Sequence, residues 1–286
     1  MSGKLYLCAT PIGNLEDITF RVVRTLKEVN LIAAEDTRHS IKLLNHFGIK
    51  TPMTSYHEHN KIDKAIYLVE KLKEGQDIAL ITDAGTPGIS DPGEVLVKEA
   101  LKAGIEVTSL PGPCAAITAL TISGLSTRRF SFEAFLPSDK KERAKVLDEL
   151  RNDTRTLILY EAPHRLGKTL KELYEVLGDR RITLVKELTK VHESILQVTI
   201  KEAISMVEEK VPKGEYVLIV EGKNPQEIEE EKRERWESFS LEEHMSYYQG
   251  KGLNKKEAMK AVAKDRGISK REIYHLLIQE GLQEKE

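Results

Sequence analysis

Carboxylate and imidazole side chains follow several apolar runs directly, and in these places they could accept a proton from a weak nucleophile. Glu35 and Asp36 follow LIAA, Glu161 follows TLILY, and SYHEHN carries His57-Glu58-His59. General bases in enzymes are usually of these types. Asp36, next to Thr37, can equally cap the helix that follows it. The candidate proton acceptors are Glu35, Asp36, His57, Glu58, His59, Glu161, His164 and Glu187.

The run His57-Glu58-His59 could also suggest a metal site. Alternate residues of an extended segment share a face, but a metal site usually needs a third protein ligand. The two cysteines, Cys8 and Cys114, have no zinc-ligand spacing and offer no disulfide framework. We therefore expect no metal, a polar or helix-capping role for the histidine run, and two reduced, buried cysteines.

Basic side chains lie beside these acids. Arg38, Arg165 and Lys186 could neutralise phosphates or orient a carboxylate, and an ion-pair network explains them equally well. The net charge of −2 gives no overall positive field of the kind that indicates nucleic-acid binding. Local basic clusters are the alternative, although each is more often a solvated surface. They are Arg128/Arg129, Lys140/Lys141/Arg143/Lys145, Lys255/Lys256 and Lys270/Arg271.

The segment ALITDAGTPGISDPGE, residues 79–94, is an apolar run that ends in a loop of glycine, proline and aspartate. Neither G-x-x-x-x-G-K-[ST] nor G-x-G-x-x-G is present, which removes the main support for ATP or dinucleotide binding. In an open α/β sheet, ligands bind outside the carboxyl ends of the strands, where small residues let backbone groups approach them. Six loops of this kind follow predicted strands: ATPIGNLEDIT (9–19), AEDTR (34–38), DAGTPGISDPG (83–93), SLPGPCAA (109–116), YEAPHR (160–165) and KELTKVHE (186–193).

The elements that position these loops alternate between strands and helices. Predicted strands at 4–10, 31–36, 53–57, 77–82 and 105–112 are separated by helices, as in a parallel α/β sheet with right-handed crossovers. A second unit has strands at 130–137, 156–163, 181–188, 195–200 and 215–222, and their close spacing favours a mixed or partly antiparallel sheet. The fold class is α/β, and we expect domains at 1–124 and 125–223 with a cleft between them.

Two of the predicted helices show an apolar stripe. The first has Asp17 or Thr19 as its N-cap, and its apolar positions are Phe20, Val22, Val23, Leu26 and Val29. The second lies within residues 61–75, and its apolar positions are Ile62, Ala65, Ile66, Val69 and Leu72. The pattern predicts amphipathic helices with these residues on the face toward the core.

The composition changes at residue 224. PQEIEEEKRERWE has no apolar face and is interpreted as a linker or solvated helix, and three short helical segments follow it. The pattern AMKAVAKDRGISKREIYHLL is similar to a helix-turn-helix, but it could equally pack only on the main body or on a partner subunit. The sequence shows neither a signal peptide nor the roughly 18 to 20 apolar residues that span a bilayer, so we expect a cytoplasmic protein with no membrane partner.

Six segments in this order, ATPIGNLEDIT, AEDTR, SYHEHN, TDAGTPGISDPG, LPGPCAA and YEAPHR, resemble the ribosomal RNA small subunit methyltransferase I family, a branch of the tetrapyrrole methylase superfamily. The helices after residue 224 resemble the small tail domain of that family. The resemblance implies S-adenosylmethionine as the methyl donor, bound in the cleft between the two α/β domains. It also implies the ribose 2′-hydroxyl of a cytidine in the 16S rRNA decoding centre as the acceptor, and a homodimer.

The resemblance implies roles for individual residues as well. Members of the superfamily commonly carry Gly-Asp-Pro where this chain has Gly85-Thr86-Pro87, so the usual carboxylate is absent and contact with the donor is expected through the backbone. The implied donor-binding residues are Pro11, Gly85, Thr86, Pro87, Ile89, Cys114, Ala115 and Tyr160. The implied substrate-binding residues are Arg38, His59, His164, Arg165 and Lys186. The catalytic candidates are Glu35, Asp36, His57 and Glu161.

Two other functions fit parts of the sequence. A tetrapyrrole C-methyltransferase would use the same donor cleft with an apolar basin for a macrocycle, but the polar loops AEDTR, SYHEHN and EAPHR favour a polyanionic substrate. A DNA-binding regulator with a ligand-sensing body would explain the helices of residues 253–280, but it would leave the six loops without a role.

Overall fold

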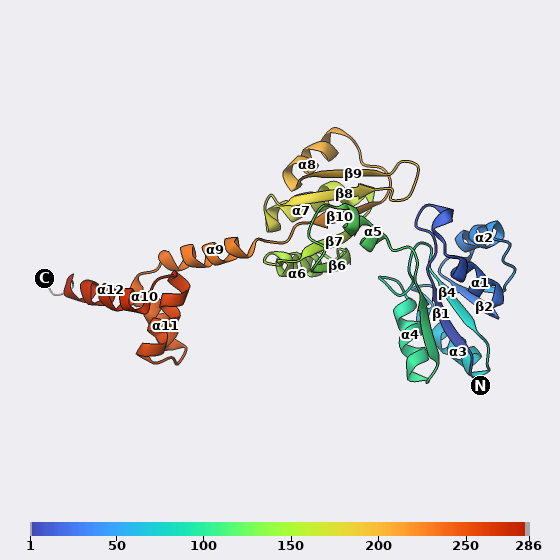
Figure 1. Cartoon of the computed structure of the whole chain (residues 1–286), viewed down its shortest axis with the longest axis horizontal. Helices are drawn as coiled ribbons and strands as arrows, with labels where there is room; N and C mark the ends of the chain where they lie inside the picture. Colours follow the sequence, from blue (N-terminus) through green and yellow to red (C-terminus); the bar gives the residue numbers. More distant parts are fainter. Residues whose placement is uncertain (1, 284–286) are drawn as a thin grey trace. The chain divides into compact units, whose positions relative to one another are not determined.

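The computed structural model describes residues 2–283 and contains all ten predicted strands, in two five-stranded sheets (Figure 1). Internal contacts divide the chain into two compact units. The larger unit contains residues up to 150 together with 155–221, and so holds both sheets. The smaller unit contains 151–154 and the residues from 222 onward. The three-part division expected at residues 124 and 223 stays a prediction.

The first sheet is parallel throughout, as its sequence predicts, with the strand order β3-β2-β4-β1-β5. Its strands are β1 (Lys4–Cys8), β2 (Leu31–Ala34), β3 (Met53–Ser55), β4 (Ile78–Ile81) and β5 (Glu106–Leu110). The connecting helices are α1 (Phe20–Glu28), α2 (Thr37–His46), α3 (Lys61–Lys73) and α4 (Gly93–Lys102), and α5 (Ala115–Ile122) follows β5. Both faces are covered by buried apolar clusters, one around Leu5 and Leu80 and the other around Ile32 and Leu110.

The second sheet is mixed, with the order β6-β7-β10-β8-β9. Its strands are β6 (Phe130–Phe135), β7 (Thr156–Glu161), β8 (Arg181–Lys186), β9 (Ser194–Thr199) and β10 (Tyr216–Val220), and its helices are α6 (Lys140–Leu150), α7 (Pro163–Leu177) and α8 (Ile200–Glu209). Strand β10 runs antiparallel to both β7 and β8. The amino end of β10 therefore lies at the same edge as the carboxyl ends of β7 and β8.

The predicted helix stripes are correct at their centres and wrong at their edges. Helix α1 is capped by Thr19 and buries Val22 and Leu26, but Phe20 is 96% exposed. Helix α3 buries Ala65, Leu68, Val69 and Leu72, while Ile62 and Ile66 are about 60% exposed. The reason is that Leu68 belongs to the buried stripe, so the centre of the stripe lies on the Leu68 side of Ala65. Successive residues of a helix are about 100° apart, which leaves Ile62 and Ile66 at the opposite edge of the stripe, where they are exposed.

The smaller unit is helical, as predicted, and we call residues 222–283 the tail. Its helices are α9 (Pro225–Glu237), α10 (Leu241–Gly250), α11 (Lys255–Arg266) and α12 (Lys270–Gln283). A small core formed by α10, α11 and α12 includes Leu241, Met245, Val262 and Ile273. Within the described residues no helix is both long and apolar enough to cross a membrane.

A buried histidine holds the tail helices together. The His244 ring stacks on Trp236 with 3.9 Å between centroids. Its Nε2 lies 3.2 Å from Asp265 Oδ2, and Arg266 Nε donates to its Nδ1 at 3.3 Å. Because a guanidinium can only donate, Nδ1 must accept, so the ring is neutral and carries its proton on Nε2.

We expect the tail to lose stability on acidification. Burial lowers the pKa of His244, against the opposing effect of Asp265, so the unfolded chain binds a proton more readily than the folded one. The stabilisation is complete above the ordinary histidine pKa of about 6.5 and is lost as the pH falls through the lower folded value. Trp236 is the single tryptophan of the chain, so its fluorescence reports unfolding of the tail. Equal pH dependence of the midpoint in His244→Phe would contradict the assignment.

Candidate active site

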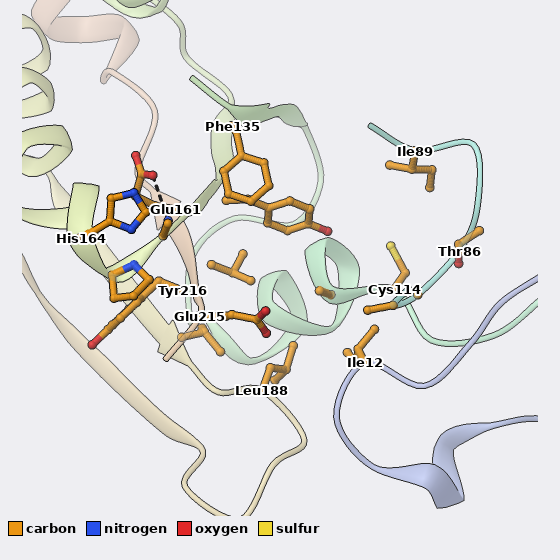
Figure 2. A pocket seen from close by; sticks show the side chains of 18 residues that line it. Ile12, Thr86, Ile89, Cys114, Phe135, Glu161, His164, Leu188, Glu215 and Tyr216 are labelled. Carbon is orange, nitrogen blue, oxygen red and sulfur yellow. Dashed lines mark hydrogen bonds between the residues drawn. The ribbon is translucent and has the colours of Figure 1, made fainter. Parts of the chain in front are cut away.

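A pocket of about 480 Å³ lies between the strand-end loops of the two sheets, within the larger unit. Figure 2 shows Ile12, Thr86, Ile89 and Cys114 from the first half of the unit opposite Phe135, His164 and Leu188 from the second. The walls are largely apolar. Of the residues implied as donor-binding, Gly85, Thr86, Ile89, Cys114, Ala115 and Tyr160 line the pocket.

Three loops of the first sheet are fastened together beneath the pocket. Thr10 and Gly85 exchange two backbone hydrogen bonds, of 2.9 and 3.0 Å. The Thr86 hydroxyl donates to the carbonyl of Pro113 at 2.9 Å, which ties the 83–93 loop to the loop before α5. Thr86 therefore holds the loop in place through a hydrogen bond that its hydroxyl donates. An ionised carboxylate at this position could not form that bond, because it has no proton to donate.

Gly85 needs to be glycine at this place. Its φ is +85°, and a Cβ built on it would lie 3.2 Å from Ile12 Cγ2. The rest of the loop is held by Asp91, whose carboxylate accepts from the backbone nitrogens of Gly88 and Gly93 at 2.7 to 2.9 Å. Asp91 thus shapes the loop, and its oxygens are already occupied by the backbone.

Tyr160 connects the two halves of the pocket. Its hydroxyl accepts from the backbone nitrogen of Ala116, in the first turn of α5, at 3.1 Å. Its ring packs edge-on against Phe132 and Phe135, with centroids 5.1 and 5.6 Å away. Burial raises the pKa of Tyr160 to about 12, so the phenol is neutral near pH 7 and forms a wall of the pocket.

Glu161 lines the pocket, but its carboxylate belongs to a buried polar network. It accepts from the Thr169 hydroxyl and from the Ala162 backbone nitrogen, and it lies 3.5 Å from Arg165 Nε. Arg143 is buried too, and it donates to Thr169 at 2.8 Å and to Glu172 at 2.6 Å. These contacts give the Glu161 carboxylate a structural role and argue against it as a proton acceptor. Because Arg143 is buried in the same network, it does not belong to a basic cluster on the surface.

The pocket also contains residues that the sequence analysis missed, among them Glu215, Tyr216 and Val217 at the beginning of β10. In Figure 2 the Glu215 carboxylate points toward the middle of the lining residues. Glu215 is exposed and pairs with Lys190 at 2.8 Å. The feature of the sequence that could have indicated these residues was the expected mixed second sheet. An antiparallel central strand begins at the edge where its neighbours end, so the residues at its start lie beside the loops that follow those neighbours.

The acids after β2 lie in a separate cluster and do not line the pocket. Asp36 caps α2 and accepts from the Arg38 side chain, which holds the pKa of that carboxyl at about 2. Glu35 accepts from the Thr82 hydroxyl. Asp83 accepts from the Asp36 backbone nitrogen, and burial together with the nearby Glu35 charge raises its pKa. The capping alternative for Asp36 and the ion-pair alternative for Arg38 are the ones observed.

Among the described residues, the pocket lining also leaves out seven of the implied site residues. Pro11 and Pro87 stand next to lining residues without joining them. His57 and His59 have ring centroids 6.0 Å apart, and among residues 2–283 no three His, Cys, Asp or Glu side chains lie close enough together to hold a metal ion.

Arg165 donates to the carbonyl of Leu136 and orients Glu161. The others outside the lining are Arg38, already described, and Lys186, which lines a different groove with Lys210 and Lys213.

Of the two cysteines, Cys8 is buried, but Cys114 is half-buried at the pocket.

The side chains of the pocket suit a cationic, partly apolar ligand and a transferable group. Backbone groups and apolar side chains can hold such a ligand without stabilising its charge strongly, which helps when the charge disappears in the reaction. Two lining groups, His164 and Glu215, are exposed and could accept a proton.

Comparison with known proteins agrees with this geometry. Residues 4–204 match the family "Tetrapyrrole (Corrin/Porphyrin) Methylases". A ribosomal RNA small subunit methyltransferase I from Halalkalibacterium halodurans is 52% identical over 97% of this chain and 96% of its own. A protein of the same name from Thermotoga maritima is 44% identical over 221 residues, which are 77% of this chain and 99% of that protein. A diphthine synthase crystal structure has the same fold, with a TM-score of 0.63, 14% identity, and coverage of 78% of this chain and 91% of that one. The chain therefore belongs to the tetrapyrrole methylase family and, within it, to the family of ribosomal RNA small subunit methyltransferase I proteins.

Proposed function

We propose that this protein transfers a methyl group from S-adenosylmethionine to the ribose 2′-hydroxyl of a cytidine in the decoding centre of 16S rRNA. The observation that carries the proposal is the pocket between the two sheets, in a chain that matches nearly the whole of a ribosomal RNA methyltransferase I. Four of the six segments that suggested the family from sequence, ATPIGNLEDIT, TDAGTPGISDPG, LPGPCAA and YEAPHR, supply most of the residues that line that pocket.

The pocket residues fit the proposed donor. A volume of about 480 Å³ is in the usual range for small-molecule sites, roughly 300 to 1,000 Å³. Gly85, Thr86 and Ala115 would hold the donor through the backbone, while Ile89, Cys114 and Tyr160 would pack against it. When bound, the donor supplies an electrophilic methyl group to the acceptor oxygen.

The chain itself must orient the ribose and remove its proton. A ribose hydroxyl is a weak nucleophile until a base accepts its proton. We propose His164 for this role because it is exposed at the pocket, with Glu215, which is also exposed but pairs with Lys190, as the alternative. Glu161, by contrast, is occupied by Thr169, Ala162 and Arg165. Loss of methyl transfer with retained donor binding in His164→Ala, but not in Glu215→Gln, would support this choice.

The test of the reaction uses small ribosomal subunits that lack the modification. We expect label from methyl-labelled S-adenosylmethionine to enter 16S rRNA, and nuclease digestion to place it on a cytidine ribose. Calorimetry should also show binding of the donor to the protein alone. Label on a base, or the absence of donor binding at millimolar concentration, would refute the proposal.

A tetrapyrrole C-methyltransferase remains the second candidate, since the matched family is named for that chemistry. The same assay with a porphyrin precursor in place of the ribosomal subunit separates the two. We expect no transfer to the tetrapyrrole, because the exposed lining residues His164 and Glu215 favour a polar substrate.

We further propose that the protein acts in the cytoplasm as a homodimer. Exposed Ile62, Ile66 and Tyr67 on α3 support an association surface in the larger unit. Light scattering after size-exclusion chromatography would measure the mass directly, and a purely monomeric protein at micromolar concentration would contradict the dimer.

A further inference from the structure

The tail carries a groove of its own, which we call the tail groove. It has a volume of about 440 Å³ and lies between α11 and α12. Its residues are Lys255, Lys256, Lys270, Tyr274, Leu277 and Ile278, with the buried Met259 beneath. Lysine side chains can pack their stems along apolar surface while their ammonium groups stay in water, so the groove combines an apolar floor with cations at its rim.

The lysines of the groove are available to a partner. Lys255 and Lys256 are exposed, Lys270 is half-buried, and none of the three forms an ion pair with another residue of the described chain. The nearest acids in sequence are already used by the backbone. Glu257 accepts from the Asn254 nitrogen, and Glu272 accepts from the Ser269 nitrogen, each in a capping box.

The charge of the chain is segregated toward this region. The whole sequence has a net charge of −2, yet residues 251–283 contain eight lysines and arginines against four aspartates and glutamates. Helix α9, at the start of the tail, is rich in glutamate. A concentration of positive charge beside an aromatic ring is the pattern with which proteins hold single-stranded nucleic acid, because phosphates contact the cations and bases stack on the ring.

The tail groove has an aromatic side chain suited to this role. Tyr274 is 55% exposed, although it lines the groove, and Ile278 beside it is 43% exposed. A base that stacks on Tyr274 would cover the ring and the neighbouring apolar side chains. Stacking of this kind tolerates any base, so the groove would hold a strand without selecting its sequence.

The family comparison separates the tail from the chemistry. The Thermotoga maritima relative is matched over 99% of its length by only 221 residues of this chain. The two sheets with their helices already need residues 4–220, so that relative is too short to hold a counterpart of the tail as well. The tail therefore lies outside the part of the chain that is shared with this relative, which contains the pocket.

We propose that the tail groove binds a single-stranded segment of small-subunit rRNA, with Lys255, Lys256 and Lys270 on phosphates and Tyr274 stacked on a base. This inference rests on the proposed function and adds a second contact with the same substrate, outside the methyl-donor pocket.

The experiment uses the full chain with the charge of the groove reversed. In Lys255→Glu/Lys256→Glu/Lys270→Glu, we expect KM for small ribosomal subunits to rise at least tenfold, with kcat and donor affinity unchanged. The salt dependence of binding to a labelled single-stranded 16S rRNA fragment should become shallower. A loss of about 0.7 in the logarithmic slope for each phosphate contact gives a total of about 2. Tyr274→Ala should weaken binding about tenfold, while Tyr274→Phe should restore it.

The matched control reverses three lysines elsewhere: Lys27→Glu/Lys73→Glu/Lys102→Glu. These stand at the carboxyl ends of α1, α3 and α4, which is the edge of the first sheet opposite the pocket loops. The control has the same change in net charge and should keep KM and the salt slope. If both triple variants behave alike, the tail groove is no RNA site. Loss of subunit binding without any loss for the rRNA fragment would indicate a ribosomal protein partner and would also overturn the inference.

The two proposals fail in different ways. If the wild-type chain transfers no methyl group to ribosomal subunits, the proposed function is wrong. If the wild-type chain transfers methyl groups and the groove variant does so with the same KM, only the inference about the tail is wrong.

Discussion

Gly85→Val is expected to abolish S-adenosylmethionine binding, by at least a hundredfold in affinity, while the chain still folds. Gly85 lines the pocket with φ +85°, where a β-branched residue is strained by about 1 to 3 kcal/mol. The new Cβ would lie 3.2 Å from Ile12 Cγ2, and the added methyl groups would occupy space that the donor needs. Calorimetry with the donor and methyl transfer to ribosomal subunits measure the loss.

Gly104→Val is the matched control for this variant. Gly104 also has positive φ, at +72°, but it stands in the turn between α4 and β5, and nothing lies within 4 Å of a Cβ at this position. Both substitutions strain the backbone to a similar degree, so thermal unfolding should fall comparably in the two variants. Only Gly85→Val should lose donor binding. Equal donor binding in the two variants would remove Gly85 from the donor site.

Arg143→Met is expected to destabilise the larger unit by about 1.5 to 3 kcal/mol, because it removes a buried guanidinium that donates to the half-buried Glu172 carboxylate and to the Thr169 hydroxyl. Arg143 is 4% exposed and connects Glu172 with Thr169, which in turn donates to Glu161. Since Glu161 ends β7 next to the pocket wall, donor affinity should fall as well. Urea unfolding followed by circular dichroism measures the free energy.

Arg181→Met supplies the comparison on the surface. Arg181 pairs with Glu221 in the same sheet region, but its side chain is 66% exposed. Exposed pairs contribute about 0 to 1 kcal/mol, so this variant should unfold almost as the wild type does. If the two variants lose equal stability, the buried network around Glu161 does not hold the pocket wall as inferred.

The first half of the pocket could be predicted from the sequence because it depends on local rules. Parallel strands separated by helices must end at one edge, so the loops after β1, β4 and β5 had to meet there. Gly85, Thr86 and Ile89 were identified in this way, together with the family resemblance. Asp91, placed in the same loop, holds that loop through backbone nitrogens, as its spacing to Gly88 and Gly93 allows.

The second half could be predicted only in part. Tyr160 and His164 follow β7 and were identified, but Glu215 and Tyr216 were missed because they come before a strand, not after one. Their place at the pocket depends on β10 being antiparallel between β7 and β8. A sequence pattern shows that a strand exists, but its direction within the sheet depends on pairing with distant residues.

The sequence by itself determined the ten strands, the order of the loops and the family, since hydrophobic periodicity and short motifs are local properties of the chain. Only the tertiary structure decided which charged side chains take part in structural hydrogen bonds and ion pairs and which are available to a ligand. Arg143 and Glu161 looked like surface and catalytic groups, yet they meet in a buried network, while Lys255, Lys256 and Lys270, beside Tyr274, form no ion pair with any residue that the structure describes. The physical reason is that the partner and the burial of a charge come from residues far away in sequence, and these set its desolvation and its hydrogen bonds.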